Sequence, residues 1–126
     1  MPNETISFFD EKEQYYHGFM AGLLSGFKGC KLRSNRESGK GRPDLMLMER
    51  MGRKTAIVIE IKAADAKNKS ETLKSKLQEA FEQIEENQYE EELRNEGSQN
   101  ILLYGAAFRE KDCLIGVLPN SKQREI

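Results

Sequence analysis

Apolar residues recur along the chain at two different spacings, and the changes of spacing predict the order of helices and strands. In the first segment they follow one another at three- and four-residue steps, as in a helix with one buried face. Shorter apolar runs bounded by glycine, proline or polar residues predict strands. The predicted elements are a helix over residues 10–27, strands over 30–35, 44–49 and 55–63, a helix over 70–94, and strands over 100–108 and 113–118.

The run over residues 55–63 is the most apolar of the predicted strands, which places it at the centre of the sheet. The second helix is amphipathic, with Ser70 or Thr72 to cap its start and Gly97 just past its end. The order αβββαββ implies an α/β or α+β fold in which helices flank a mixed central β-sheet.

The length of 126 residues corresponds to a single domain, with a core over about residues 10–118 and a frayed tail over 119–126. A hydrophobic content of 37% is enough for a modest core. No apolar stretch approaches the ~20 residues of a membrane span, and residues 1–4 lack the features of a signal peptide, so the expected location is the cytoplasm. Cys30 and Cys113 are expected to be reduced.

Charge is distributed unevenly, although the formal net charge is only -1. Residues 28–54 hold nine basic and three acidic residues, which makes this segment a candidate to face phosphates. Residues 71–96 hold nine acidic and three basic residues, a surface that should point away from DNA. Both segments could also be no more than solvated faces.

Three charged residues lie at the ends of predicted strands. Asp44 opens the second strand, and Glu60 and Lys62 close the apolar third strand, where the period of two sends both side chains to one face. If Asp44 lies beside Glu60, the two carboxylates and the Ile61 carbonyl form an oxygen-rich site suited to Mg²⁺ or Mn²⁺. Such a metal activates water and neutralises a scissile phosphate, with Lys62 assisting the nucleophile. The alternative is that Asp44 is a turn residue and Glu60 and Lys62 form a surface pair.

Pro43-Asp44 followed by Glu60-Ile61-Lys62 resembles the motif of the PD-(D/E)xK nuclease superfamily, which implies a restriction-endonuclease-like core. The chain from about Glu13 to Leu118 is similar to the nuclease-like domain at the C-terminus of a group of bacterial AAA-ATPase-like proteins. The further segments that carry this similarity are Tyr16-His17-Gly18-Phe19 with Leu23-Leu24, residues 34–44, Gln83-Ile84 with Tyr89, and Tyr104-Gly105 with Phe108.

The resemblance implies that Asp44 and Glu60 bind metal, that Lys62 is the catalytic lysine, and that Glu13 is a supporting acid. Helical spacing independently places Glu13 on or beside the buried stripe of the first helix, where an acid favours a cation, although the helix dipole would also favour an acid there. His17 lies on the same side and is either a supporting hydrogen bonder or a satisfied core histidine.

The remaining candidates come from the second helix and from the loop before Asp44. Gln83 resembles a position that faces the active site in many nucleases of this superfamily, but it could equally be a solvated helix residue. Arg36, Lys40 and Arg42 lie in a glycine-containing hairpin and are candidate phosphate contacts.

The leading hypothesis is a Mg²⁺- or Mn²⁺-dependent nuclease acting on nucleic acid, DNA rather than RNA. Two alternatives are a catalytically silent module that binds nucleic acid or protein, and an interaction domain that uses the acidic second helix. The resemblance also suggests an ATPase-domain partner, since the chain itself has no Gly-x-x-x-x-Gly-Lys-Ser/Thr phosphate loop. A homodimer would let a small nuclease reach both strands of a duplex, and no membrane partner is expected.

Overall fold

A computed structural model describes residues 8–25, 29–34, 43–49, 51–52 and 54–121 of the chain. The described elements are α1 (Phe8–Leu24), β1 (Cys30–Ser34), β2 (Leu45–Glu49), β3 (Thr55–Ala63), α2 (Leu73–Glu86), α3 (Tyr89–Asn95), β4 (Asn100–Arg109) and β5 (Asp112–Leu118). All five predicted strands are confirmed within two residues at each end.

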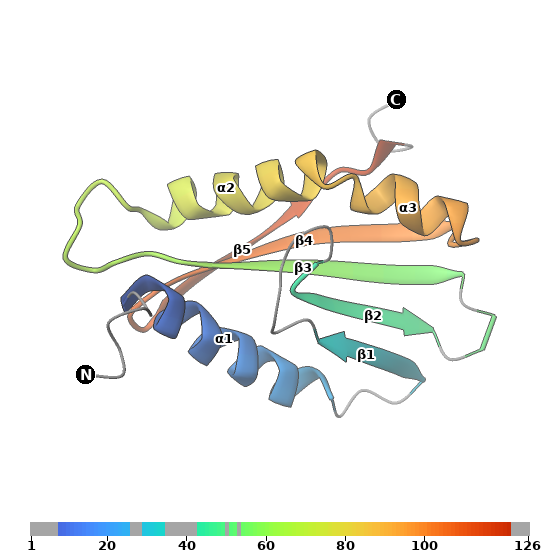
Figure 1. Cartoon of the computed structure of the whole chain (residues 1–126), viewed down its shortest axis with the longest axis horizontal. Coiled ribbons are helices and arrows are strands. Elements are labelled where there is room, and N and C mark those ends of the chain that lie inside the picture. Colours follow the sequence, from blue (N-terminus) through green and yellow to red (C-terminus); the bar gives the residue numbers. More distant parts are fainter. Residues whose placement is uncertain (1–7, 26–28, 35–42, 50, 53, 122–126) are drawn as a thin grey trace.

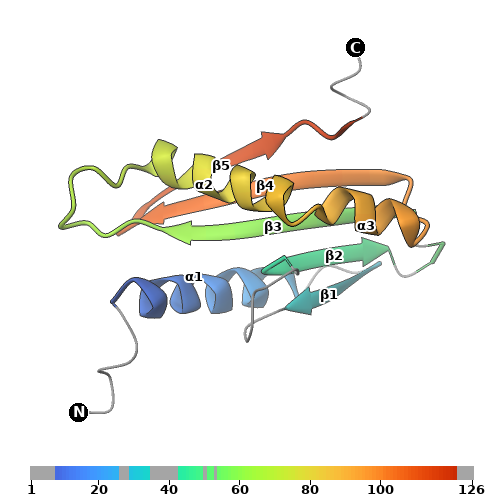
Figure 2. The ribbon, with the colours of Figure 1, turned by 45° about the horizontal axis from the view of Figure 1, so that its top comes forward.

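The strands form one five-stranded sheet in the order β1-β2-β3-β4-β5 (Figure 1; Figure 2). The pairs β1/β2, β2/β3 and β4/β5 are antiparallel, whereas β3/β4 is parallel. Parallel neighbours need a crossover connection, and α2 and α3 supply it between β3 and β4. The structure therefore confirms the predicted α+β fold, with β3 at the centre of a mixed sheet, consistent with a restriction-endonuclease-like fold.

Helices cover both faces of the sheet, and the alternation of side chains along β3 divides the core between them (Figure 1). Ala56 and Val58 belong to a buried cluster that includes Ile84 of α2 and Tyr89 and Leu93 of α3. On the opposite face, the odd-numbered residues of β3 pack with α1. This second cluster consists of Tyr16, Leu45, Ile59, Ile61, Ala63, Ala106 and Phe108.

The single helix predicted over residues 70–94 is wrong, because the structure divides this segment into α2 and α3. Gln88 between them adopts a left-handed conformation, with φ of 54°. Asn87 Nδ2 donates a hydrogen bond of 2.8 Å to the hydroxyl of Tyr89, and Tyr89 is only 1% exposed. The break thus redirects the chain so that Tyr89 and Leu93 enter the core, and it coincides with a five-residue step between the apolar residues Ile84 and Tyr89.

Capping decides where α2 begins. Of the two predicted caps, Thr72 is the one used: its hydroxyl accepts a hydrogen bond from the Ser75 amide at 3.0 Å, and Ser75 Oγ accepts one from the Thr72 amide at 3.0 Å. These reciprocal bonds satisfy two amides that have no partner within the helix. The first helix ends at Leu24, earlier than the predicted residue 27.

The described part of the C-terminal tail is held in place, contrary to the expectation of a frayed segment from residue 119. Asn120 is buried and donates a hydrogen bond of 2.6 Å to the Ile101 carbonyl. Ser121 Oγ donates to Glu90 at 2.6 Å. Both cysteines lie on strands and form no disulfide, as predicted. None of the described helices is long and apolar enough to cross a membrane.

Candidate active site

The antiparallel pairing of β2 and β3 brings the predicted site residues together. Leu45, the first residue of β2, pairs with Ile59 of β3, so Asp44 lies beside Glu60 and Ile61. The Ile61 amide donates a hydrogen bond of 2.8 Å to Asp44 Oδ2, and the Asp44 amide donates one of 3.0 Å to Glu60 Oε1. These two bonds orient both carboxylates, and the predicted adjacency of Asp44 and Glu60 is confirmed.

The site lies on the face of the sheet that α2 and α3 cover. Glu60 and Lys62 alternate with Ile59 and Ile61, which pack toward α1, so both charged side chains leave β3 on the other face. Glu60 is 0% exposed, whereas Lys62 is half-buried. A fully buried carboxylate at the end of a central strand rules out the alternative that Glu60 belongs to a surface pair.

Burial and mutual repulsion disfavour negative charge in this pair. Burial, and then the nearby Asp44 carboxylate, raise the pKa of Glu60 to about 8, against the opposing effects of the Asp44 amide, Lys62 and Tyr89. Burial also raises the pKa of Asp44, although the Ile61 amide, His17 and Lys62 act in the opposite direction. A buried and a half-buried carboxylate with too little positive charge around them form a site that favours a cation.

The raised pKa of Glu60 predicts that the metal-free protein loses stability as pH rises. The Glu60 carboxyl keeps its proton up to about pH 8 in the folded state but only to about pH 4.5 in the unfolded state. Its contribution to the free energy of unfolding is therefore full below pH 4.5 and is lost as pH rises to 8. The slope from this group approaches about 1.4 kcal/mol per pH unit. Urea denaturation in chelator between pH 5.5 and 8.5 measures it.

Glu60→Gln is the control for this pH dependence, because it removes the titrating group and keeps the shape of the side chain. The fall in unfolding free energy should flatten in this variant. A wild-type protein whose stability rises over the same pH range would contradict the assigned pKa.

The donor atoms at the site fit a hard divalent cation. Oε2 of Glu60 is buried and has no hydrogen-bond partner among the described residues. The carbonyl of Ile61 faces the same side as its amide, toward Asp44, because the N–H and C=O of a strand residue point the same way. The described residues contain no group of three or more histidine, cysteine, aspartate or glutamate side chains placed to bind a metal. Two carboxylates and one carbonyl are therefore the described donor set.

The structure also brings one residue of α1 near this pair. His17 is 6% exposed, and its charge lowers the pKa of Asp44, so it lies close enough to interact with that carboxylate. Glu13 belongs to α1, but its side chain is outside the described part of the structure, as are Arg36, Lys40 and Arg42. The roles of these residues stay predictions.

Gln83 is half-buried and contacts the site through a residue that was not predicted as part of it. Burial, and then the Glu60 charge, raise the pKa of the Tyr89 hydroxyl, against the opposing effects of hydrogen bonds with Asn87 and Gln83. Tyr89 therefore links Gln83 to Glu60. The sequence carried a usable signal, since a tyrosine on an apolar stripe needs a polar partner for its hydroxyl.

The basic segment over residues 28–54 does not form one surface around the site. Lys31 pairs with Met48 near the far end of β2, and Lys54 immediately precedes β3, so both lie at the opposite end of the strands from Asp44. Both side chains are exposed. Lys31 and Lys54 are therefore not candidates to contact a phosphate at the site, and the other predicted contacts, Arg36, Lys40 and Arg42, lie outside the described residues.

Comparison with known families agrees with this site. The family described as the PD-(D/E)XK nuclease superfamily matches residues 11–117, which is most of the chain and includes Asp44, Glu60 and Lys62. No curated protein and no solved structure matches the chain. The order of strands, the adjacent carboxylates and the extent of this match together assign the chain: it belongs to the PD-(D/E)XK nuclease superfamily.

Proposed function

We propose that the protein is a metal-dependent nuclease that hydrolyses phosphodiester bonds in DNA. The observation that carries this proposal is the pair of half-buried Asp44 and buried Glu60, whose carboxylates each accept a hydrogen bond from a backbone amide, with Glu60 Oε2 left without a described partner. Burying a carboxylate is costly unless a cation or hydrogen bonds compensate it. Membership of a nuclease superfamily supports the same chemistry.

Asp44, Glu60 and the Ile61 carbonyl are the groups that would hold Mg²⁺ or Mn²⁺, with Glu13 of α1 as a further ligand. When bound, such an ion lowers the pKa of a water molecule and offsets the charge on the scissile phosphate. Lys62 shares the face of Glu60 and presents an ammonium group that can orient the attacking water and stabilise the developing negative charge.

The supporting residues act through these groups. Tyr89, with Gln83 and Asn87 at its hydroxyl, holds the Glu60 side chain from the α2 and α3 side. His17 approaches Asp44 from α1. Both contacts restrict the carboxylates to one arrangement, and such restriction is what a metal site requires of its surroundings.

We also propose a domain extent, a location and partners for the protein. We infer a single domain over residues 1–126 that acts in the cytoplasm, either as a homodimer on duplex DNA or with an ATPase-domain partner. Arg36, Lys40 and Arg42 precede Asp44 in the chain and would contact phosphates near the site.

Conversion of supercoiled plasmid to nicked or linear DNA tests the proposed activity. The wild type should cleave with Mg²⁺ or Mn²⁺ and stop in chelator, and Lys62→Ala should lower the rate by about 100-fold or more, since it removes a charge that stabilises the transition state. Lys54→Ala removes an equal charge far from the site and should cleave normally. A folded wild type that binds metal but leaves plasmid, single-stranded DNA and RNA intact would contradict the proposal and favour a silent binding module.

A further inference from the structure

The turn that connects β3 to α2, residues 64–72, holds two lysines, Lys67 and Lys69, and two acidic residues, Asp65 and Glu71. Three more lysines flank it in the chain: Lys62, Lys74 and Lys76. The turn begins two residues after Lys62, so it directly follows the strand that carries Glu60. Lys67 and Lys69 therefore lie on the segment that follows the strand of the candidate active site.

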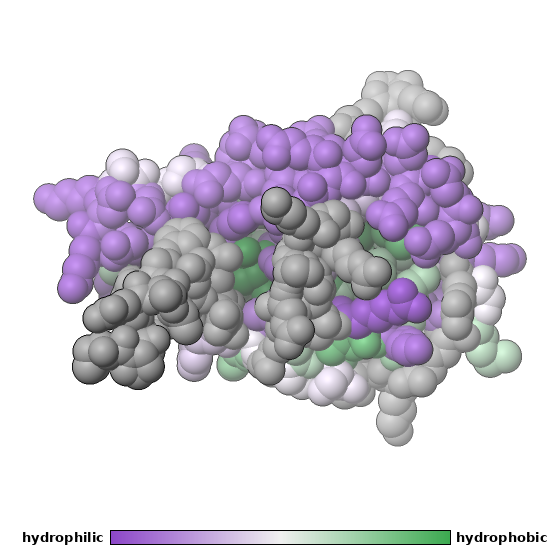
Figure 3. Space-filling view, in the orientation of Figure 1, coloured by the Kyte–Doolittle hydropathy of each residue, from purple (hydrophilic) through white to green (hydrophobic). Residues whose placement is uncertain are grey.

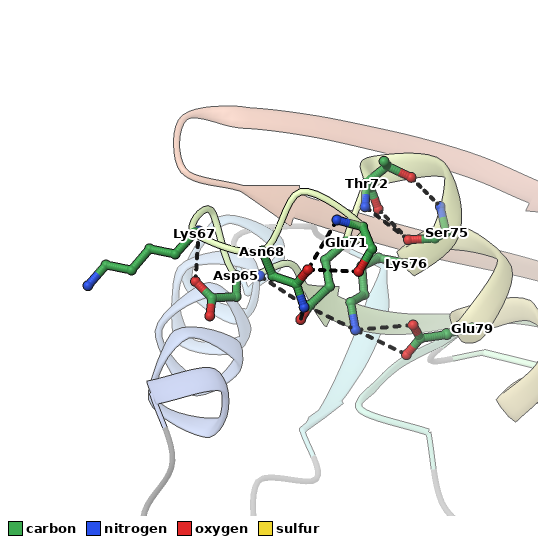
Figure 4. Close-up of polar contacts among 9 residues, drawn as sticks. Asp65, Lys67, Asn68, Glu71, Thr72, Ser75, Lys76 and Glu79 are labelled. Carbon is green, nitrogen blue, oxygen red and sulfur yellow. Dashed lines mark hydrogen bonds and ion pairs between the residues drawn. The ribbon is translucent and has the colours of Figure 1, made fainter.

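Hydrogen bonds within the turn hold its backbone in one shape (Figure 4). Asp65 Oδ1 accepts from the Lys67 amide at 2.9 Å, and Asn68 Oδ1 accepts from the amide and hydroxyl of Ser70 at 3.1 and 2.7 Å. Glu71 Oε1 accepts from the Asp65 amide at 2.9 Å, which closes the turn. The turn is thus preorganised, so ordering it on binding costs little entropy.

A residue outside the turn holds it against the sheet. Arg109, the last residue of β4, donates a hydrogen bond of 3.0 Å from Nη2 to the Ala66 carbonyl. The Ala64 amide donates one of 2.7 Å to the Phe108 carbonyl. The position of the turn relative to the end of β3 is therefore fixed by the neighbouring strand.

The two acidic residues of the turn accept hydrogen bonds, whereas its two lysines have no ion-pair partner among the described residues. Glu71 forms an ion pair with the buried Lys76 at 3.4 Å, and Lys76 also pairs with Glu79 at 3.1 Å. The side chains of Lys67 and Lys69 are exposed and form no ion pair within the described residues. Figure 4 shows Lys67 extended away from the turn. Two unpaired ammonium groups thus project from a rigid turn.

Negative charge is concentrated on the exposed surface of α2 and α3. Hydrophilic residues cover α2 and α3 (Figure 3), and exposed acids are concentrated beyond the first turns of α2. These exposed acids are Glu79, Glu82, Glu85, Glu86, Glu91, Glu92 and Glu96. The acidic surface repels a polyanion, whereas Lys67 and Lys69 attract one. The two regions together favour a position of the nucleic-acid backbone along the turn, beside the candidate site.

We propose that the turn over residues 64–72 is a phosphate-binding element that holds the nucleic-acid backbone beside the candidate active site, with Lys67 and Lys69 each contacting a phosphate. The location of the scissile phosphate rests on the function proposed above, whereas binding by the turn does not. Lysine contacts of this kind position a duplex without reading its sequence. Affinity should therefore depend on salt and little on base composition.

Fluorescence anisotropy with a labelled DNA duplex, in chelator so that no cleavage occurs, tests the turn. Lys67→Ala/Lys69→Ala should reduce the slope of log affinity against log salt by about 2, since each lost phosphate contact accounts for about 0.9. Lys31→Ala/Lys54→Ala removes two exposed charges at the far end of the sheet and should keep the wild-type slope. Lys67→Arg/Lys69→Arg should keep it as well, because the charge is retained.

The outcomes separate this inference from the proposed activity. An unchanged slope in Lys67→Ala/Lys69→Ala, an equal loss in the control variant, or no duplex binding by the wild type would overturn the inference, even if the wild type cleaves plasmid. A wild type that binds through these lysines but never cleaves would support the turn and contradict the nuclease proposal. Thermal unfolding of each variant confirms that the fold is kept.

Discussion

Glu60→Gln is expected to lower the cleavage rate by at least about 1,000-fold while making the metal-free protein more stable at pH 8. Glutamine keeps the size of the side chain but removes the negative charge that would hold the metal, and a bound metal ion supplies several kcal/mol of transition-state stabilisation. The same charge is buried beside Asp44, which raises the pKa of Glu60 to about 8. Removing it relieves a repulsion that opposes folding.

The two effects have opposite signs, and this makes the prediction specific. A variant that merely damaged the fold would lose both activity and stability. Plasmid cleavage and urea denaturation of the same preparation measure the two quantities, and Glu92→Gln, at an exposed position of α3, is the matched control. Full activity in Glu60→Gln would remove Glu60 from the proposed metal site.

Gly105→Ala is expected to have the largest effect on stability, because α2 packs directly on this residue of β4. A Cβ atom at Gly105 would lie 2.7 Å from Leu77 Cδ1, 3.1 Å from Ala80 Cβ and 3.2 Å from Phe81 Cε1. Leu77 can rotate, but Ala80 Cβ is fixed to the helix backbone, so α2 must move. Overpacking of this kind costs about 1–3 kcal/mol.

The same substitution at Gly22 is the control, because an added Cβ there meets nothing within 4 Å and Gly22 is an exposed residue of α1. Gly22→Ala should stabilise the protein by up to about 1 kcal/mol, since alanine favours helix more than glycine does. Thermal denaturation should therefore move the two variants in opposite directions. Equal melting temperatures for Gly105→Ala and the wild type would mean that α2 is not seated on this glycine.

Gly105 also shows why the helix lies so close to the sheet at this point. Gly116 of β5 pairs with Gly105, and a Cβ there would lie 2.7 Å from Leu77 Cδ2 and 3.1 Å from Phe81 Cζ. Two adjacent residues without side chains let α2 approach the strands. The sequence shows these glycines, but only the register makes them neighbours.

The strands could be predicted because their signals are local. Residues 55–63 are mostly apolar, with Glu60 and Lys62 near their end, and this segment coincides with the observed bounds of β3. The prediction of a single helix over residues 70–94 misses the break between α2 and α3, although the apolar spacing changes there: Ile84 and Tyr89 are five residues apart rather than three or four. The burial of Tyr89 against Glu60, a contact between distant segments, determines that break.

The residues of the candidate site could likewise be predicted only in part. Asp44, Glu60 and Lys62 could be selected from the sequence, because charged residues at the ends of apolar strands need a reason to be there. Their roles in catalysis stay predictions. Tyr89 could not be assigned to the site from spacing, because it lies 29 residues after Glu60 and reaches it only through the packing of α3 on the sheet.

The sequence by itself determined the order of the strands, the central position of β3 and the choice of Asp44 and Glu60 as candidate metal ligands, since periodicity and charge are properties of neighbouring residues. The tertiary structure alone decided which face of the sheet carries Glu60, that the Ile61 amide donates a hydrogen bond to Asp44, and that Lys31 and Lys54 lie far from the site. The physical reason is that register and packing join residues that are distant in sequence, and no local pattern encodes those distances.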